Sequence, residues 1–213
     1  MELHIGTGYD GNTRTVAMIV GHFARRIENH LQDLWLNIST NGTAQAESAG
    51  HVHYATVSYT CTQSVLSKLD LSDKDTFVDV GCGKGRVVCL AAKQKVAEVI
   101  GIEYSPNLAS IAERNIGSLK GRRSPARILC QPAETSDYSD ATVLYFFNPF
   151  EASLLDLVLC KIQADTLGRP MRMAFVMESE KQRDVFCCHS WLTCYDRYKD
   201  EDMHSVAFYR SHC

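Results

Sequence analysis

Thr76-Phe77-Val78-Asp79-Val80-Gly81-Cys82-Gly83-Lys84-Gly85-Arg86 is the stretch of the chain from which its fold is most directly inferred. An apolar run with one acid breaks into three glycines at alternate positions. This pattern is typical of a buried parallel strand that turns tightly into a helix. Because glycine lacks Cβ, the backbone of the turn can pass close to a ligand. The helix predicted from Arg86 to Lys95 directs its first amides toward the same place.

The glycine spacing argues against a dinucleotide site. The fingerprint G-x-G-x-x-G needs its third glycine at position 86, which is Arg86 in this chain. Here the third glycine comes one residue earlier, at Gly85, and Asp79 precedes the first glycine by two residues. The turn is therefore expected to hold a ligand other than a dinucleotide.

Asp79-x-Gly81-x-Gly83-x-Gly85 resembles the cofactor motif of class I S-adenosylmethionine-dependent methyltransferases. The resemblance implies that the acid and the glycine turn face the methionine end of the cofactor. The physics agrees, because a carboxylate accepts from an ammonium while a helix N-terminus favours a carboxylate. The expected cofactor is S-adenosyl-L-methionine and the product S-adenosyl-L-homocysteine. A nicotinamide enzyme is the contrasting hypothesis, which binding of NAD in place of this cofactor would support.

A second acid strengthens this interpretation. Residues 96–103 are predicted to form the next strand, which ends in Glu103. In a strand-helix-strand unit an acid at this place reaches the two ribose hydroxyls. Ser105 then precedes Pro106 and is expected to cap the following helix. The pair of Asp79 with Glu103 is the strongest evidence in the sequence.

Two further segments complete the expected cofactor site. In class I methyltransferases the turn after the third strand, here Pro132-Ala133-Glu134, cradles the adenine. Tyr54, upstream of the motif acid, is placed as in the non-SET histone-lysine methyltransferases, whose corresponding segment closes over the methionine moiety; Thr56 stands where those enzymes have glutamate. The residues expected at the cofactor are Tyr54, Thr56, Asp79, Gly81, Cys82, Gly83, Gly85, Glu103, Tyr104, Ser105, Ala133, Glu134 and Asn148.

The acceptor site is expected after the fourth strand, residues 141–147. Asn148-Pro149-Phe150 resembles the [D/N/S]-P-P-[Y/F/W] motif of amino-group methyltransferases, with one proline instead of two. The resemblance implies that the Asn148 oxygen and a carbonyl accept hydrogen bonds from the target amine, and that the aromatic ring packs on it. The alternative is an ordinary strand end before a helix. His53 or His51 is the first candidate for a general base, against a structural role.

The pattern of elements predicts an α/β three-layer sandwich. It has a mostly parallel seven-stranded sheet whose last strand is antiparallel, and an N-terminal helical cap. Residues 1–50 are expected to form the cap and a linker, and residues 51–213 the methyltransferase domain. Within the cap, apolar residues recur at helical spacing over 13–38, and 39–50 reads as a hinge.

The charge of the chain limits the kinds of molecule that it is expected to bind. With a net charge of −3 and a pI near 6.2, the chain has no global basic field to hold a nucleic acid. The cluster Lys120-Gly121-Arg122-Arg123 reads as a solvated turn at the end of the sheet away from the site. A small molecule is the favoured methyl acceptor and a protein lysine the runner-up, with a nucleic acid third. A catalytically silent cofactor-binding subunit is the alternative from another class, and the oligomeric state is undetermined.

The nine cysteines favour a reduced, cytoplasmic protein, because no secretory signal precedes them and several lie inside predicted strands and helices. No apolar run approaches the length of a membrane span. Cys187, Cys188, His189 and Cys194 could be metal ligands, but no pair of C-x-x-C knuckles accompanies them. The sequence therefore predicts no metal.

Overall fold

The computed structural model describes residues 25–42, 57–200 and 203–212. These residues build one seven-stranded sheet in the order β3-β2-β1-β4-β5-β7-β6. Its strands are β1 (Thr76–Val80), β2 (Glu98–Glu103), β3 (Ala126–Cys130), β4 (Val143–Phe147), β5 (Arg172–Val176), β6 (Leu192–Lys199) and β7 (Ser205–Ser211). The first five pair in parallel, while β7 runs antiparallel to both β5 and β6. The predicted sheet and its antiparallel last strand are confirmed.

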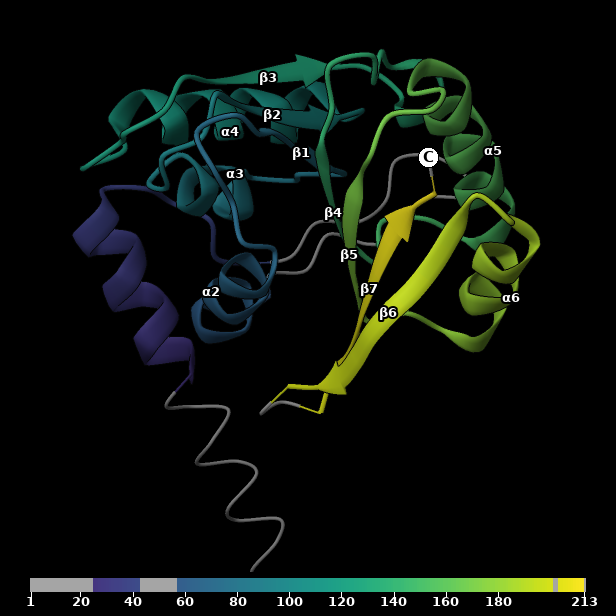
Figure 1. Cartoon of the computed structure of the whole chain (residues 1–213). Coiled ribbons are helices and arrows are strands. Elements are labelled where there is room, and N and C mark those ends of the chain that lie inside the picture. Colours follow the sequence, from purple (N-terminus) through teal and green to yellow (C-terminus); the bar gives the residue numbers. More distant parts are fainter. Residues whose placement is uncertain (1–24, 43–56, 201–202, 213) are drawn as a thin grey trace, which may run out of the picture.

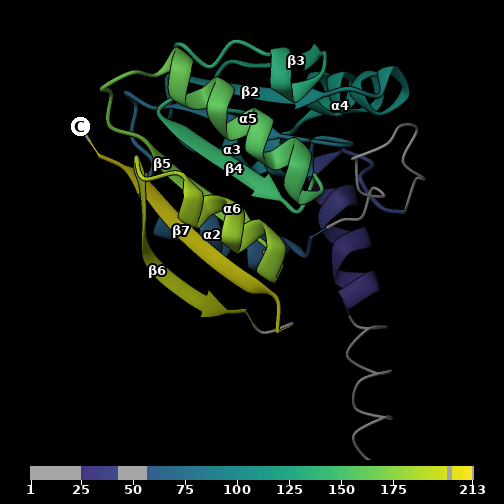
Figure 2. The same cartoon turned by 90° about the vertical axis from the view of Figure 1, so that its right-hand side faces the viewer.

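Helices cover both faces of the sheet (Figures 1 and 2). They are α2 (Tyr59–Lys68), α3 (Arg86–Ala91), α4 (Pro106–Ser118), α5 (Ala152–Asp165) and α6 (Glu180–Cys188), with a 3₁₀ turn η1 (Ala133–Thr135). One apolar core packs α2, α3 and α4 on the first face, and a second packs η1, α5 and α6 on the other. The three-layer sandwich is thus confirmed. Helix α3 ends at Ala91, before the predicted Lys95.

The carboxyl ends of β1, β2 and β4 lie at one edge of the sheet because these strands are parallel neighbours. Asp79, Glu103 and Asn148 all come from these ends. Open α/β sheets bind ligands beyond the carboxyl ends of their strands. The topology therefore brings the predicted cofactor and acceptor residues to the same edge.

Before α2 the structure describes a helix over residues 25–36 and an extended segment over 38–42, here called the strap. The helix was expected. At the start of the expected hinge, Ser39, Thr40 and Asn41 hydrogen-bond to α4, to Arg86 and to Asp33. The first residues of the predicted linker are therefore fixed on the cofactor edge. Residues 43–50 lie outside the described residues, so the hinge stays a prediction.

No helix within residues 25–42, 57–200 and 203–212 is long and apolar enough to cross a membrane. The expected cytoplasmic location stays a prediction.

Candidate active site

The glycine turn connects β1 to α3 by backbone hydrogen bonds and close packing. The amides of Gly81 and Cys82 both donate to the Ile102 carbonyl at 2.9 Å. Gly81 has φ of 78°, and a Cβ there would lie 2.5 Å from Cβ of Pro149. Both the backbone conformation and the packing demand glycine at this position. The turn after β1 and the turn after β4 are therefore in contact, which brings the predicted cofactor and acceptor motifs together.

Asp79 is a buried acid that has no compensating cation among the residues that the structure describes. Its exposed fraction is 2%, and burial, followed by repulsion from Glu103, raises the pKa of Asp79 well above its usual range. Within the described part of the chain, no side chain or amide donates a hydrogen bond to it. A buried carboxylate in this state is costly unless a ligand supplies the positive charge. The ammonium of the methionine moiety fits this need.

Replacing Asp79 with asparagine is expected to weaken cofactor binding while sparing the fold. A raised folded pKa means that ionising this carboxyl opposes folding. The wild type therefore loses stability relative to Asp79→Asn as pH rises from about 3.9, the usual unfolded value, through the raised folded value. Urea unfolding without cofactor, at acidic and neutral pH, checks the sign. Calorimetric titration with S-adenosylhomocysteine checks the affinity, and equal affinity for both proteins would refute the ammonium contact.

Glu103 shapes the turn from the second strand. Its two carboxylate oxygens accept from the Gly83 amide at 2.8 Å and the Ser105 amide at 2.9 Å, and its exposed fraction is 4%. Each carboxylate oxygen has two lone pairs and can accept more than one hydrogen bond, so a carboxylate at this place is chemically suited to a diol. Ser105 is the N-cap residue of α4 as expected, but its side chain makes no capping hydrogen bond. Its amide supports Glu103 instead.

The turn after β3 offers an acceptor for the adenine. Oε2 of Glu134 is buried and has no hydrogen-bond partner among the described residues, while the neighbouring Ala133 carbonyl accepts from the Tyr138 hydroxyl at 2.8 Å. A buried acceptor left without a donor is uncommon in native proteins. The exocyclic amine of an adenine would supply that donor. The residues present therefore fit S-adenosylmethionine at three places: Asp79, Glu103 and Glu134.

Arg86 is a site residue that sequence reasoning did not single out. Although it opens α3, it is 3% exposed. Its guanidinium donates to Thr40 Oγ1 and the Val57 carbonyl, both at 2.7 Å, and to Asn41 Oδ1 at 3.0 Å. It also lies over the Tyr59 ring, 4.4 Å from the centroid. One signal in the sequence could have identified it: Arg86, a charged residue, occupies the position where a dinucleotide-binding motif has its third glycine.

Asp33, from the helix over 25–36, is the anion of the same buried cluster. Its carboxylate lies 3.6 Å from the Arg86 guanidinium and accepts from the Thr40 amide at 2.7 Å and the Tyr59 hydroxyl at 2.5 Å. Burial and the bond to Asp33 raise the pKa of Tyr59. The Lys84 ammonium, within the glycine turn, donates to the Asn41 carbonyl at 2.7 Å. The strap is thereby fastened directly onto the glycine turn.

Asn148 lies at the carboxyl end of β4, where it was expected, in a left-handed conformation with φ of 39°. Its Oδ1 accepts from Gln182 Nε2 at 2.7 Å, and the same nitrogen donates to the Phe150 carbonyl at 2.7 Å. Gln182, which sequence reasoning also missed, is 3% exposed and belongs to the capping box of α6. Gln182 therefore orients the Asn148 amide, whose oxygen keeps a second lone pair.

The prediction for Phe150 is wrong. Its side chain is 2% exposed and packs in the core under α5 and α6, so its ring is no wall for an acceptor. This chain has one proline, Pro149, where the amino-group methyltransferase motif has two, and the next residue, Phe150, is buried in the core. Pro149 instead packs on Gly81. The role of Asn148 stays a prediction.

The remaining predicted residues fall into two groups. His51, His53, Tyr54 and Thr56 lie outside the described residues, so the base and the flap contact stay predictions. Cys82 is buried in the turn, and burial raises the pKa of its thiol well above its usual range, so it is an inert thiol. Tyr104 is half-buried next to Glu103.

Glu178, at the end of β5, belongs to a structural cluster. Its buried carboxylate pairs with Arg183 and Arg197 and accepts from the Tyr209 hydroxyl. The Glu178 charge is therefore neutralised within the protein. Ser179 and Gln182 form the capping box that begins α6.

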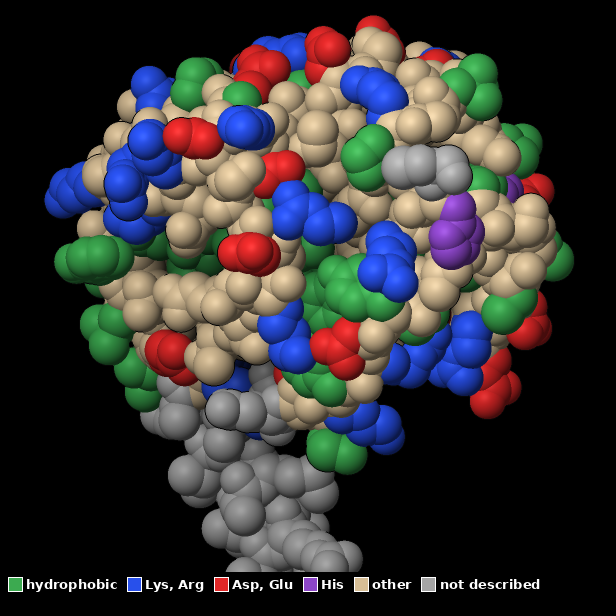
Figure 3. All heavy atoms as spheres, in the orientation of Figure 1, with side chains coloured by type: hydrophobic (Ala, Val, Ile, Leu, Met, Phe, Trp, Pro, Cys, Tyr) green, Lys and Arg blue, Asp and Glu red, His purple; other side chains and the backbone are tan. Residues whose placement is uncertain are grey.

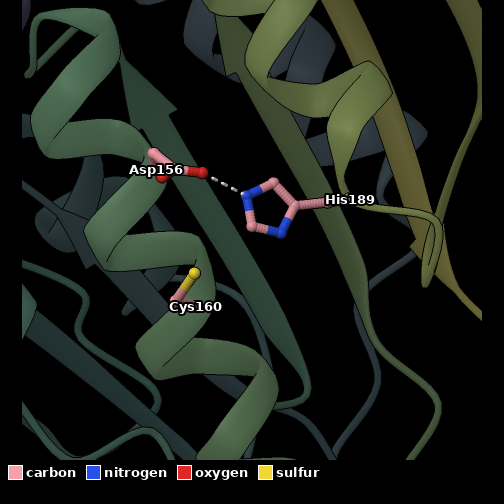
Figure 4. Close-up of side chains that lie close together, drawn as sticks. All are labelled: Asp156, Cys160 and His189. Atoms are coloured by element: carbon pink, nitrogen blue, oxygen red, sulfur yellow. Dashed lines mark hydrogen bonds and ion pairs between the residues drawn. The ribbon is translucent and has the colours of Figure 1, made fainter.

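Asp156, Cys160 and His189 are the one candidate metal cluster found among the described residues (Figure 4). Trp191 Nε1 donates to His189 Nδ1 at 3.1 Å, so the ring proton sits on Nε2 and points to Asp156 Oδ1 at 2.9 Å. A metal bound to Nε2 would require the imidazole proton to sit on Nδ1. Nδ1 already accepts the hydrogen bond from the Trp191 indole N–H, so it cannot carry that proton. The arrangement suits a hydrogen-bonded link between α5 and the end of α6.

Comparison with known proteins agrees with the fold. Residues 38–125 match the family model described as histone methylation protein DOT1. An RNA methyltransferase from Salinibacter ruber, in complex with S-adenosyl-L-homocysteine, is 20% identical with a TM-score of 0.60, covering 74% of this chain and 94% of that one. A SAM-dependent O-methyltransferase from Thermotoga maritima is 17% identical with a TM-score of 0.57, covering 75% and 68%.

A third structure, magnesium protoporphyrin IX methyltransferase from Synechocystis with bound SAM, is 10% identical with a TM-score of 0.56, covering 72% of this chain and 80% of that one. No curated protein sequence matches the chain. The structural likenesses show the class I fold, and the family match spans the strap, the glycine turn and both acids. Both findings agree with the class I S-adenosylmethionine-dependent methyltransferase fold, which is the fold expected from the sequence.

Proposed function

We propose that the protein methylates an amino nitrogen, with a protein lysine as the acceptor. The observation that carries the proposal is the match of residues 38–125 to a family described by histone methylation. The described site is compatible with an amine, because Asn148 Oδ1, a side-chain oxygen oriented by a hydrogen bond, lies at the carboxyl end of β4. This choice reorders the expectation from the sequence, which favoured a small molecule.

Each residue has a definable task. Asp79 holds the ammonium of the cofactor, Glu103 the ribose hydroxyls and Glu134 the adenine amine. When bound, S-adenosylmethionine supplies a methyl group already activated on a sulfonium. Asn148, oriented by Gln182, accepts an N–H of the acceptor and so aims the nitrogen lone pair. Catalysis then needs mainly alignment and exclusion of water.

A small molecule is the second candidate acceptor. The strap and the helix over 25–36 lie against the glycine turn through Arg86 and Lys84, so the chain supplies its own cover for this edge. A covered edge suits a compact acceptor. The experiment below separates the two candidates.

The test uses S-adenosylmethionine labelled on its methyl group, incubated with the protein and an extract of its source organism. We expect label in the protein fraction, recovered as methyl-lysine after hydrolysis. Asn148→Ala should lower turnover about tenfold, the loss of one hydrogen bond of about 1.4 kcal/mol, with cofactor affinity retained. Asn107→Ala, exposed on α4, is the matched control and should behave as the wild type.

The other outcomes are equally informative. Label in the small-molecule fraction would replace lysine by the second candidate. Cofactor binding without label in any fraction would support a silent partner subunit. Unchanged turnover of Asn148→Ala would remove Asn148 from the acceptor site.

A further inference from the structure

The helix over 25–36 turns its apolar side outward. Ile27, Leu31, Leu34 and Trp35 have exposed fractions of 47%, 58%, 60% and 66%. The side that faces the protein carries the buried Asp33 instead. A helix of this kind normally buries its apolar stripe. The polar cluster with Arg86 fixes the opposite orientation and leaves the aromatic ring at the surface.

Basic residues from two loops gather around this ring. The Lys93 ammonium lies 4.8 Å from the centroid of the Trp35 ring and donates to the Lys120 carbonyl at 3.2 Å. The Lys120 amide in turn donates to the Leu36 carbonyl at 3.0 Å, and the Arg123 amide to the Ala92 carbonyl at 2.8 Å. These contacts join the loop before β2, the loop before β3 and the end of the helix into one surface.

We call Trp35, Lys93, Lys120, Arg122 and Arg123 the basic–tryptophan surface. In the described part of the chain none of its four cations pairs with a carboxylate, whereas nearby Lys95 pairs with Asp73 and Arg127 with Glu98. Figure 3 shows Lys and Arg side chains gathered beside hydrophobic side chains on this side of the molecule. The four cations of this surface form a local patch of positive charge on a chain whose net charge is −3.

We propose that the basic–tryptophan surface binds a single-stranded nucleic acid. Its cations would contact phosphates, and a base would stack on the exposed part of the Trp35 ring. The exposed tryptophan is what favours a nucleic acid over an acidic peptide, whose carboxylates would use the cations but have no base to stack. The surface lies at the amino ends of β2 and β3, away from the cofactor turn, so it anchors a partner and takes no part in the chemistry.

This surface goes beyond the proposed function, because a lysine methyltransferase does not require it. The sequence showed the basic run at 120–123, but it gave no reason to place Trp35 and Lys93 beside it. The contact of Trp35 with Lys93 spans two segments that are far apart in the chain.

The test measures binding of a fluorescent single-stranded RNA of about 12 nucleotides by anisotropy. Four phosphate contacts predict that log K falls with log salt with a slope of about −3. In a Trp191→Phe background, Trp35 is the one remaining tryptophan, and its fluorescence should be quenched on binding. The triple variant Lys120→Ala, Arg122→Ala, Arg123→Ala should bind at least about tenfold more weakly, with the slope reduced by about 2.

Two variants separate stacking from charge. Trp35→Leu keeps an apolar side chain and should weaken binding about fivefold or more without changing the salt slope, as expected for a lost stacking contact. Lys95→Ala with Arg127→Ala removes the same kind of charge from paired positions and should leave binding within about twofold of the wild type. The affinity of each variant for S-adenosylhomocysteine should equal that of the wild type.

Absence of RNA binding would overturn the proposal. So would equal binding of poly-glutamate and RNA without quenching of Trp35, because that result would identify an acidic protein as the partner.

Discussion

Arg86→Ala is expected to lower the free energy of unfolding by about 3–5 kcal/mol, the usual cost of removing one partner of a buried ion pair. The side chains of Arg86 and Asp33 are 3% and 5% exposed. Without the guanidinium, the buried Asp33 carboxylate loses its cation, and the Val57 carbonyl and Asn41 amide oxygen lose a donor. Urea unfolding followed by circular dichroism measures the change in midpoint at constant slope.

Two variants define the origin of that loss. Arg86→Lys keeps the charge but not the planar fork that serves Thr40, Val57 and Asn41 together, so it should recover only part of the stability. Arg122→Ala removes an arginine that makes no ion pair within the described residues and should stay within about 0.5 kcal/mol of the wild type. If Arg86→Ala is as stable as Arg122→Ala, the buried cluster does not hold the strap.

Glu103→Ala is expected to weaken cofactor affinity at least tenfold. Each charged hydrogen bond to a ribose hydroxyl contributes about 1.5–3 kcal/mol, and tenfold corresponds to about 1.4 kcal/mol. The carboxylate also accepts from the Gly83 and Ser105 amides, so its removal loosens the glycine turn as well. Calorimetric titration with S-adenosylhomocysteine gives the affinity, and unfolding by urea shows whether the variant is folded.

Two controls accompany Glu103→Ala. One changes another acid on β2, and the other makes a milder substitution at Glu103 itself. Glu98→Ala removes the acid from the other end of β2, where it pairs with Arg127 at the surface, and should leave affinity unchanged. Glu103→Gln keeps one acceptor oxygen and should fall between the wild type and the alanine variant. Wild-type affinity in a folded Glu103→Ala protein would remove Glu103 from the cofactor site.

Much of the cofactor edge was readable from local patterns. An apolar run, an acid and alternating glycines predicted β1, its turn and α3, because strand burial and left-handed turn positions leave local signatures. The same logic placed Glu103 at the end of β2 and Asn148 at the end of β4. The parallel register then brings all three to one edge, as expected for this fold.

Other features depended on partners that are distant in sequence. Gln182 reaches Asn148, and Arg86 reaches Thr40, across separations of 34 and 46 residues. Phe150 fits the pattern of an acceptor motif, yet it packs in the core because the chain turns inward after Pro149. A pattern within a few residues cannot predict which distant residue a side chain will contact in the folded protein.

The succession of strands and helices, the glycine turn and the pair of acids can all be inferred from local sequence, since each follows from periodicity or turn chemistry within a few residues. The tertiary structure alone decided which side of the helix over 25–36 is buried. A helix normally buries its apolar stripe, but the ion pair of Asp33 with Arg86 holds the polar side inward and exposes Trp35. A buried charge must meet its partner, and only the folded chain brings these two together.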